Sequence, residues 1–178
     1  MITAPLSLEH IIKPSSISEG KAPVLFMFHG YGSNEEDLYS FAPELPEELC
    51  IISVRAPYTL EPFGYAWYAI NFDAVQGKWS DDSQAGESRE KIITFIDESC
   101  KTYGLDEKRV TLLGFSQGTI LSYAVALSYP EKIKSLDLLK VDRIQSRLIA
   151  IKGQYLLFDD NTVLNIRKHN GYVLEIET

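Results

Sequence analysis

Residues 111–121 read TLLGFSQGTIL, an apolar strand that runs into Gly-x-Ser-x-Gly and then into a helix of small and apolar residues. This order predicts a nucleophile elbow, a sharp strand-to-helix turn that exposes the hydroxyl of Ser116 above a sheet. Gly114 and Gly118 fit such a turn, because residues without a Cβ let the strand and the helix pack closely. The first N–H groups of the helix would point at an anion forming beside Ser116. The alternative interpretation is a glycine-rich turn with an incidental serine.

The composition is typical of one globular domain. The 178 residues are 45% hydrophobic and 24% charged, enough to bury a core without disulfides, metals or a cofactor. The formal net charge of −8 argues against nucleic acid or an anionic membrane as partner. Cys50 and Cys100 have no ligand spacing, and we expect them to be core residues in a reducing compartment. Without a leader-like start or a run of 18 apolar residues, the sequence indicates a cytoplasmic protein with no membrane span.

A second motif follows the apolar run 22–28, which is typical of a strand buried on both faces of a parallel sheet. The next residues are His29-Gly30-Tyr31-Gly32. In hydrolases with a nucleophile elbow, the loop after such a strand supplies one backbone N–H of the oxyanion hole. By position, the two donors are the amides of Tyr31 and Gln117. His29 precedes the nucleophile, so we expect it to organise this loop by hydrogen bonds and not to act as a base.

The remaining periodic segments predict an α/β fold with a mostly parallel sheet and helices on both faces. Strands are expected at 6–13, 49–54 and 109–113, and helices at 34–41, 87–103 and 117–128, with Gly104 ending the second helix. A loop rich in aromatic residues spans 62–79. Phe63, Tyr65 and Trp67 in this loop either line an apolar substrate pocket or pack beneath the loop, and the sequence leaves both interpretations open.

These motifs, in this order and spacing, resemble the phospholipase/carboxylesterase family of α/β-hydrolases, which includes the acyl-protein thioesterases. The resemblance covers about residues 6–134 and rests on His29-Gly30-Tyr31-Gly32, Arg55-Ala56-Pro57, the 64–72 loop and Gly114-Phe115-Ser116-Gln117-Gly118. It implies that Ser116 is the nucleophile of a hydrolase acting on a small-molecule ester or thioester. The amides of Tyr31 and Gln117 would then be the oxyanion donors, and no metal is implied.

The C-terminal part departs from the family pattern. Family members continue with βα units that carry an acid and then a histidine, whereas residues 147–178 read as short β-rich runs separated by turns. We therefore expect an α/β-hydrolase-like domain at 1–134, truncated after the nucleophile helix, and an atypical tail at 135–178 that forms an antiparallel β meander. The tail resembles the end of an uncharacterised bacterial family. A spliced, truncated or fused gene would explain both halves.

His169 is the only histidine after Ser116, and so the only candidate base in hydrolase chain order. Asn170-Gly171 beside it predicts a tight local hairpin with little reach across a sheet. If the tail folds back, Asp159 or Asp160 would orient His169. His10, in the first strand, is expected to be a half-buried strand residue.

Two functions remain open. One is a serine hydrolase that works through an acyl-enzyme, and the other is an impaired remnant that acts at most as a binding module. The sequence does not fix the acyl and alcohol groups, the choice between ester and thioester, or the oligomeric state.

Overall fold

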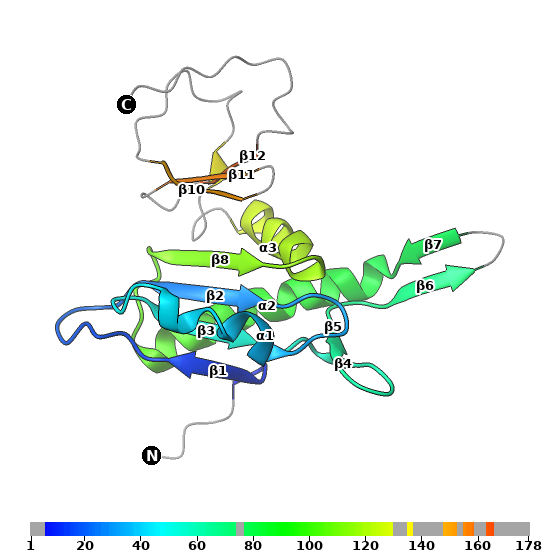
Figure 1. Cartoon of the computed structure of the whole chain (residues 1–178), viewed down its shortest axis with the longest axis horizontal. Helices are drawn as coiled ribbons and strands as arrows, with labels where there is room; N and C mark the ends of the chain where they lie inside the picture. Colours follow the sequence, from blue (N-terminus) through cyan, green and yellow to red (C-terminus); the bar gives the residue numbers. More distant parts are fainter. Residues whose placement is uncertain are drawn as a thin grey trace, which may run out of the picture.

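A mostly parallel four-stranded sheet forms the centre of the chain (Figure 1). The computed structural model describes residues 6–73, 77–129, 135–136, 148–152, 155–158 and 163–165. The strands lie in the order β1, β3, β2, β8, which are His10–Lys13, Cys50–Val54, Val24–Phe28 and Val110–Gly114. Strand β2 runs parallel to both of its neighbours, and β1 pairs antiparallel with β3. The predicted α/β architecture is therefore confirmed.

Helices cover both faces of this sheet, as Figure 1 shows. They are α1, α2 and α3, at Glu35–Tyr39, Asp82–Tyr103 and Gln117–Ser128, with a short 3-10 helix η1 at Ala42–Glu44. Alternate residues of β2 serve two separate cores, because successive side chains of a strand point to opposite faces. Phe26 and Phe28 pack with residues of α2 and α3, whereas Leu25 and Met27 pack with Leu38 of α1. Strands β2 and β3 are consequently buried along their whole length.

Helix α2 begins earlier than the sequence analysis predicts, at Asp82 and not at Glu87. Asp81 is its N-cap, since its carboxylate accepts a hydrogen bond of 3.0 Å from the Gln84 N–H. The predicted end is confirmed, because Gly104 follows the last residue with the left-handed φ of 65° that favours glycine. None of the helices in the described part of the chain is long and apolar enough to cross a membrane.

The aromatic segment 62–79 is not a plain loop, which corrects the prediction. Within and just before it, β4 (Tyr58–Thr59) pairs with β5 (Tyr65–Ala66), and β6 (Ile70–Asp73) pairs with β7 (Gly77–Ser80), both antiparallel. The aromatic residues favour strands, and glycines adopt the positive φ at Gly64, directly before β5, and at Gly77, the first residue of β7. Two short hairpins therefore connect β3 to α2.

The C-terminal part contains a second sheet in the order β10, β11, β12, β9. These strands are Leu148–Lys152, Tyr155–Phe158, Val163–Asn165 and Ser135–Leu136. The first three pair antiparallel in sequence order, so the predicted meander is confirmed, and β9 adds to β12 in parallel. His169, Asp159 and Asp160 lie outside the described residues. A domain boundary near residue 134 stays a prediction.

Candidate active site

Ser116 occupies a strained turn between the end of β8 and the start of α3. Its φ of 51° is positive, and no other non-glycine residue in the described part of the chain has a positive φ. Such a conformation is disfavoured for residues with a Cβ, and it persists only where the surroundings impose it. Here the Phe115 N–H donates to the Phe28 carbonyl at 3.0 Å, and the Gly118 N–H donates to the Phe115 carbonyl at 2.9 Å. The Ser116 side chain is exposed at this turn.

The two glycines of the motif are needed because the backbone passes too close for a side chain. A Cβ at Gly118 would lie 2.0 Å from the carbonyl oxygen of Phe28, at the end of β2. A Cβ at Gly114 would lie 2.4 Å from the backbone nitrogen of Thr119, in the first turn of α3. Each glycine thus allows α3 to begin directly over the ends of two neighbouring strands. The strand–turn–helix arrangement predicted from residues 111–121 is present.

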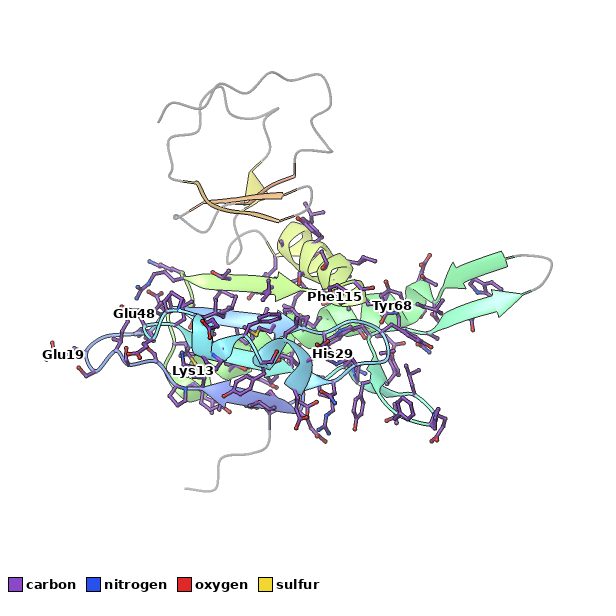
Figure 2. All side chains as sticks on the ribbon, viewed as in Figure 1. Lys13, Glu19, His29, Glu48, Tyr68 and Phe115 are labelled. Carbon is purple, nitrogen blue, oxygen red and sulfur yellow. The ribbon has the colours of Figure 1, made fainter. Side chains whose placement is uncertain are left out.

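The loop after β2 passes directly beside this turn. A Cβ at Gly30 would lie 3.4 Å from the Ser116 Cβ and 2.9 Å from the Phe115 ring, so the backbone of the loop passes within contact distance of the serine. Figure 2 labels His29, Tyr68 and Phe115 at the same end of the sheet, where β2 and β8 finish. The carboxyl ends of parallel strands therefore bring the two predicted motifs together.

No hydrogen-bond partner is found within the described part of the chain for the backbone amides of Tyr31 and Gln117, nor for those of Gly30 and Ser116. The next amide along the loop is used, since the Gly32 N–H donates to the Tyr65 carbonyl at 2.9 Å. Gln117 is the first residue of α3, where N–H groups have no partner in the helix. The assignment of the Tyr31 and Gln117 amides as oxyanion donors stays a prediction, and their backbone positions are compatible with it.

His29 is fully buried, and both of its ring nitrogens are hydrogen-bonded. Its Nε2 accepts from the Ala56 N–H at 3.0 Å, so Nδ1 carries the proton and donates to the Gly30 carbonyl at 2.7 Å. Burial is the main reason that the pKa of His29 is lowered from its ordinary value of 6.5. The ring is thus a neutral organiser of the loop and has no nitrogen available for Ser116.

The side chain of Gln117 connects the turn to the aromatic segment, a role that sequence reasoning did not identify. Its Nε2 donates to the Tyr68 carbonyl at 2.8 Å, and its Oε1 accepts from the Trp67 N–H at 3.1 Å. The Trp67 ring N–H in turn donates to the His29 carbonyl at 2.9 Å. Nothing in the sequence indicates these partners, because they lie 38 to 50 residues apart.

The three aromatic residues predicted to bind substrate occupy different environments. Trp67 is fully buried and packs edge-on against Phe28, with ring centroids 5.5 Å apart, so its ring supports the loop from the core. Phe63 is 79% exposed, and Tyr65 is half-buried beneath the Arg55 guanidinium. A role in substrate binding stays a prediction for Phe63, Tyr65 and Trp67.

The other sequence candidates do not join this site in the described part of the chain. His10 is half-buried as predicted, with Nε2 2.7 Å from the Tyr103 hydroxyl and Nδ1 3.0 Å from the Leu8 carbonyl. His169 lies outside the described residues. Among the described side chains, no group of three His, Cys, Asp or Glu residues is placed to hold a metal ion.

Comparison with known proteins links the chain to esterases by fold. The carboxylesterase of Mesorhizobium loti matches 75% of this chain with a TM-score of 0.61 and 20% identity, and esterase PE8 matches 72% with a TM-score of 0.60 and 24% identity. The Bacillus cereus carboxylesterase matches 72% with a TM-score of 0.58 and 23% identity. At these identities the match concerns the fold, and it confirms the resemblance stated from the sequence at that level.

Two sequence comparisons add to the match of fold. A Bacillus subtilis (strain 168) protein named "Putative hydrolase MhqD" is 24% identical over 111 residues, which are 62% of this chain. A family model described as "Protein of unknown function (DUF2797)" matches residues 69–174. The chain spans 53% of the Bacillus subtilis protein and about 60% of the three solved esterases, 57% to 61% of each.

Substitution of Gly118 by alanine tests the close approach of α3 to β2. The added methyl group would meet the Phe28 carbonyl, so we expect a loss of about 1–3 kcal/mol in the free energy of unfolding. Gly86→Ala is the matched control, because nothing lies within 4 Å of a Cβ at that position in α2. It should stabilise the protein by about 0.5–1 kcal/mol. Urea unfolding measures both changes, and equal effects would contradict the packing described.

The buried His29 predicts a pH dependence of stability. The folded state keeps this ring neutral, whereas the unfolded chain takes up a proton below about pH 6.5. The free energy of unfolding should therefore decrease as the pH falls below 6.5, by up to about 1.4 kcal/mol per unit of pKa difference. His29→Gln should be less stable at neutral pH and should lose this contribution. Urea unfolding at pH 5 to 8 checks this, and a parallel pH dependence of the two proteins would disprove it.

Proposed function

The chain belongs to the family described as "Protein of unknown function (DUF2797)", and since its fold is that of the carboxylesterases we propose that it is a serine hydrolase of small-molecule carboxylic esters or thioesters. The observation that carries the proposal is the strained, exposed Ser116 beside Gly30, with unpartnered amides nearby. Strained residues with positive φ cluster at functional sites, and backbone amides beside an exposed hydroxyl are compatible with stabilisation of an oxyanion.

The proposed reaction follows from these positions. A base removes the proton of Ser116 Oγ, which attacks the carbonyl carbon of the substrate. The amides of Tyr31 and Gln117 donate to the resulting oxyanion, and the positive end of α3 lies beside it. Collapse of this intermediate breaks the C–O or C–S bond and releases the alcohol or thiol, protonated by the same base. Water, deprotonated by the same base, then attacks the acyl-enzyme, and the carboxylic acid leaves as Ser116 Oγ takes up the proton.

The alternative function is a binding module with little catalysis. It is favoured by one observation: both histidines in the described part of the chain, His10 and His29, have both ring nitrogens engaged elsewhere. The site would then bind an ester without activating Ser116 fully. An oxyanion hole without the rest of a triad still gives catalysis above the rate in water. The dependence of hydrolysis on the Ser116 hydroxyl therefore distinguishes the two functions.

The two cysteines support a proposal about the compartment. Cys50 and Cys100 are both buried, and burial raises the pKa of the Cys50 thiol to about 11. Buried protonated thiols of this kind are typical of proteins from reducing compartments. We propose that the protein works in the cytoplasm.

Hydrolysis of 4-nitrophenyl acetate tests the role of Ser116. We expect measurable but weak hydrolysis by the parent protein, below the usual enzyme range of about 1–1,000 per second. Ser116→Ala should remove most of this hydrolysis and leave only the residual rate that the oxyanion donors give above the rate in water. Ser128→Ala, an exposed serine at the other end of α3, should leave it unchanged. Equal activity of parent and Ser116→Ala would refute the assignment of the nucleophile, and turnover within the usual range would exclude the binding module.

The candidate base is tested separately. Because the turn at Asn170-Gly171 predicts a local hairpin, we expect His169→Ala to keep esterase activity within about threefold of the parent, less than about 1 kcal/mol of transition-state stabilisation. The initial rates of the two proteins on the same ester give this ratio. A decrease of a hundredfold or more would show that His169 is the base.

A further inference from the structure

An arginine–carboxylate pair lies next to the loop 29–34, which carries Tyr31. The Nε of Arg55 donates to Glu35 Oε2 at 2.7 Å, and a second guanidinium nitrogen donates to Glu35 Oε1. Glu35 is the first residue of α1, and its side chain is only 9% exposed. Arg55 also contacts Glu9, but that carboxylate is 73% exposed, so this contact adds little. The bidentate pair with Glu35 is therefore the main interaction of the guanidinium.

The same guanidinium also contacts Tyr65, whose backbone is hydrogen-bonded to the loop 29–34. Its central carbon lies 4.8 Å from the centre of the Tyr65 ring. The backbone of Tyr65 pairs with the loop, since the Gly32 N–H donates to the Tyr65 carbonyl at 2.9 Å and the Tyr65 N–H donates to the Ser33 carbonyl at 2.8 Å. One guanidinium thus contacts the hairpin that supports the middle of the loop and the helix that follows its end.

The start of the loop depends on the residue next to Arg55. The Ala56 N–H donates to His29 Nε2, the bond that fixes the tautomer and orientation of that ring. The backbone of Arg55 is itself bonded to the residue that precedes β1, because its N–H donates to the Glu9 carbonyl at 2.8 Å. A displaced Arg55 would consequently move the partner of His29 as well as those of Tyr65 and Glu35.

The loop needs such support because it contains no helix or strand of its own. Tyr31, at its tip, is 42% exposed, so packing alone does not fix the direction of its amide. An oxyanion donor is effective only if it points to the place where negative charge develops, and an error of about 1 Å is costly. The position of the loop therefore depends on contacts with the segments that pack against it.

We propose that Arg55 is a positioning residue of the site, which fixes the loop 29–34 through Glu35, Tyr65 and the adjacent Ala56 so that the Tyr31 amide faces Ser116. This inference rests on the proposed function. Arg55 does not touch substrate in this role. Its planar guanidinium can bond Glu35 through two parallel hydrogen bonds and also stack on Tyr65, which a lysine ammonium cannot do.

Arg55→Lys is the variant that tests this role, because it keeps the positive charge beside the buried Glu35. Full removal of the charge, as in Arg55→Met, would leave that carboxylate unpaired and could prevent folding. Arg109→Lys is the matched control: Arg109 also bonds a carboxylate, Asp106, at 2.7 Å, and a backbone carbonyl, that of Lys21, at 2.6 Å. It immediately precedes β8, at the end of the sheet opposite Ser116.

Two measurements on the full chain test the positioning role of Arg55. In Arg55→Lys we expect the exchange of the Gly32 and Ala56 amide protons with D2O, followed by NMR, to be at least tenfold faster, with exchange in β2 unchanged. With 4-nitrophenyl acetate, kcat should decrease about ten- to a hundredfold while KM stays within about twofold, because a displaced oxyanion donor affects the transition state. Arg109→Lys should change neither quantity.

The two measurements separate this inference from the proposed function. Unchanged exchange at Gly32 and Ala56 in Arg55→Lys overturns the positioning role, whether or not the parent hydrolyses esters. Faster exchange with unchanged kcat also overturns it, because the loop would then not supply an oxyanion donor. If the parent has no esterase activity, the proposed function fails, and the exchange data alone decide whether Arg55 fixes the loop.

Discussion

The close approach between Gly118 and the carbonyl oxygen of Phe28 sets the position of the site. A Cβ at residue 118 would be 2.0 Å from that oxygen, so α3 can start over the end of β2 only because this residue is glycine. Gly114 permits the same approach of α3 to the end of β8. Phe115 and Ser116 must then connect strand and helix in one tight turn, and the positive φ of Ser116 follows from that. The exposed hydroxyl is a consequence of how helix and sheet pack.

Buried polar groups fix the segments around this turn. The His29 ring, the Gln117 side chain and the Trp67 ring N–H are all buried, and each is hydrogen-bonded to a different segment. An unsatisfied buried polar group is costly, so each bond restricts the segments that it joins. These bonds join the loop after β2, the turn at Ser116 and the aromatic segment, which are the segments around the proposed oxyanion site. Arg55 extends the same connections to α1.

The parts of the fold with a regular sequence pattern were predictable. The continuous apolar run at 22–28 and the small-residue helix at 117–128 appear where the sequence predicts them, because burial and helical periodicity are local properties. The early start of α2 was missed because its first turn is polar and only the cap at Asp81 marks it. The bond between Arg55 and Glu35 depends on how β3 and α1 pack, which no spacing in the sequence reveals. The motif therefore predicts Ser116 as the nucleophile, whereas the contacts that support its surroundings are visible only in the structure.

Reaction with a fluorophosphonate tests the central claim most directly, because this reagent phosphonylates a serine only where the hydroxyl is activated and the new oxyanion is stabilised. The account predicts one adduct by intact-mass measurement, located by peptide mapping at Ser116 and absent in Ser116→Ala. An adduct at a different serine, or no adduct after prolonged exposure to excess reagent, would contradict it.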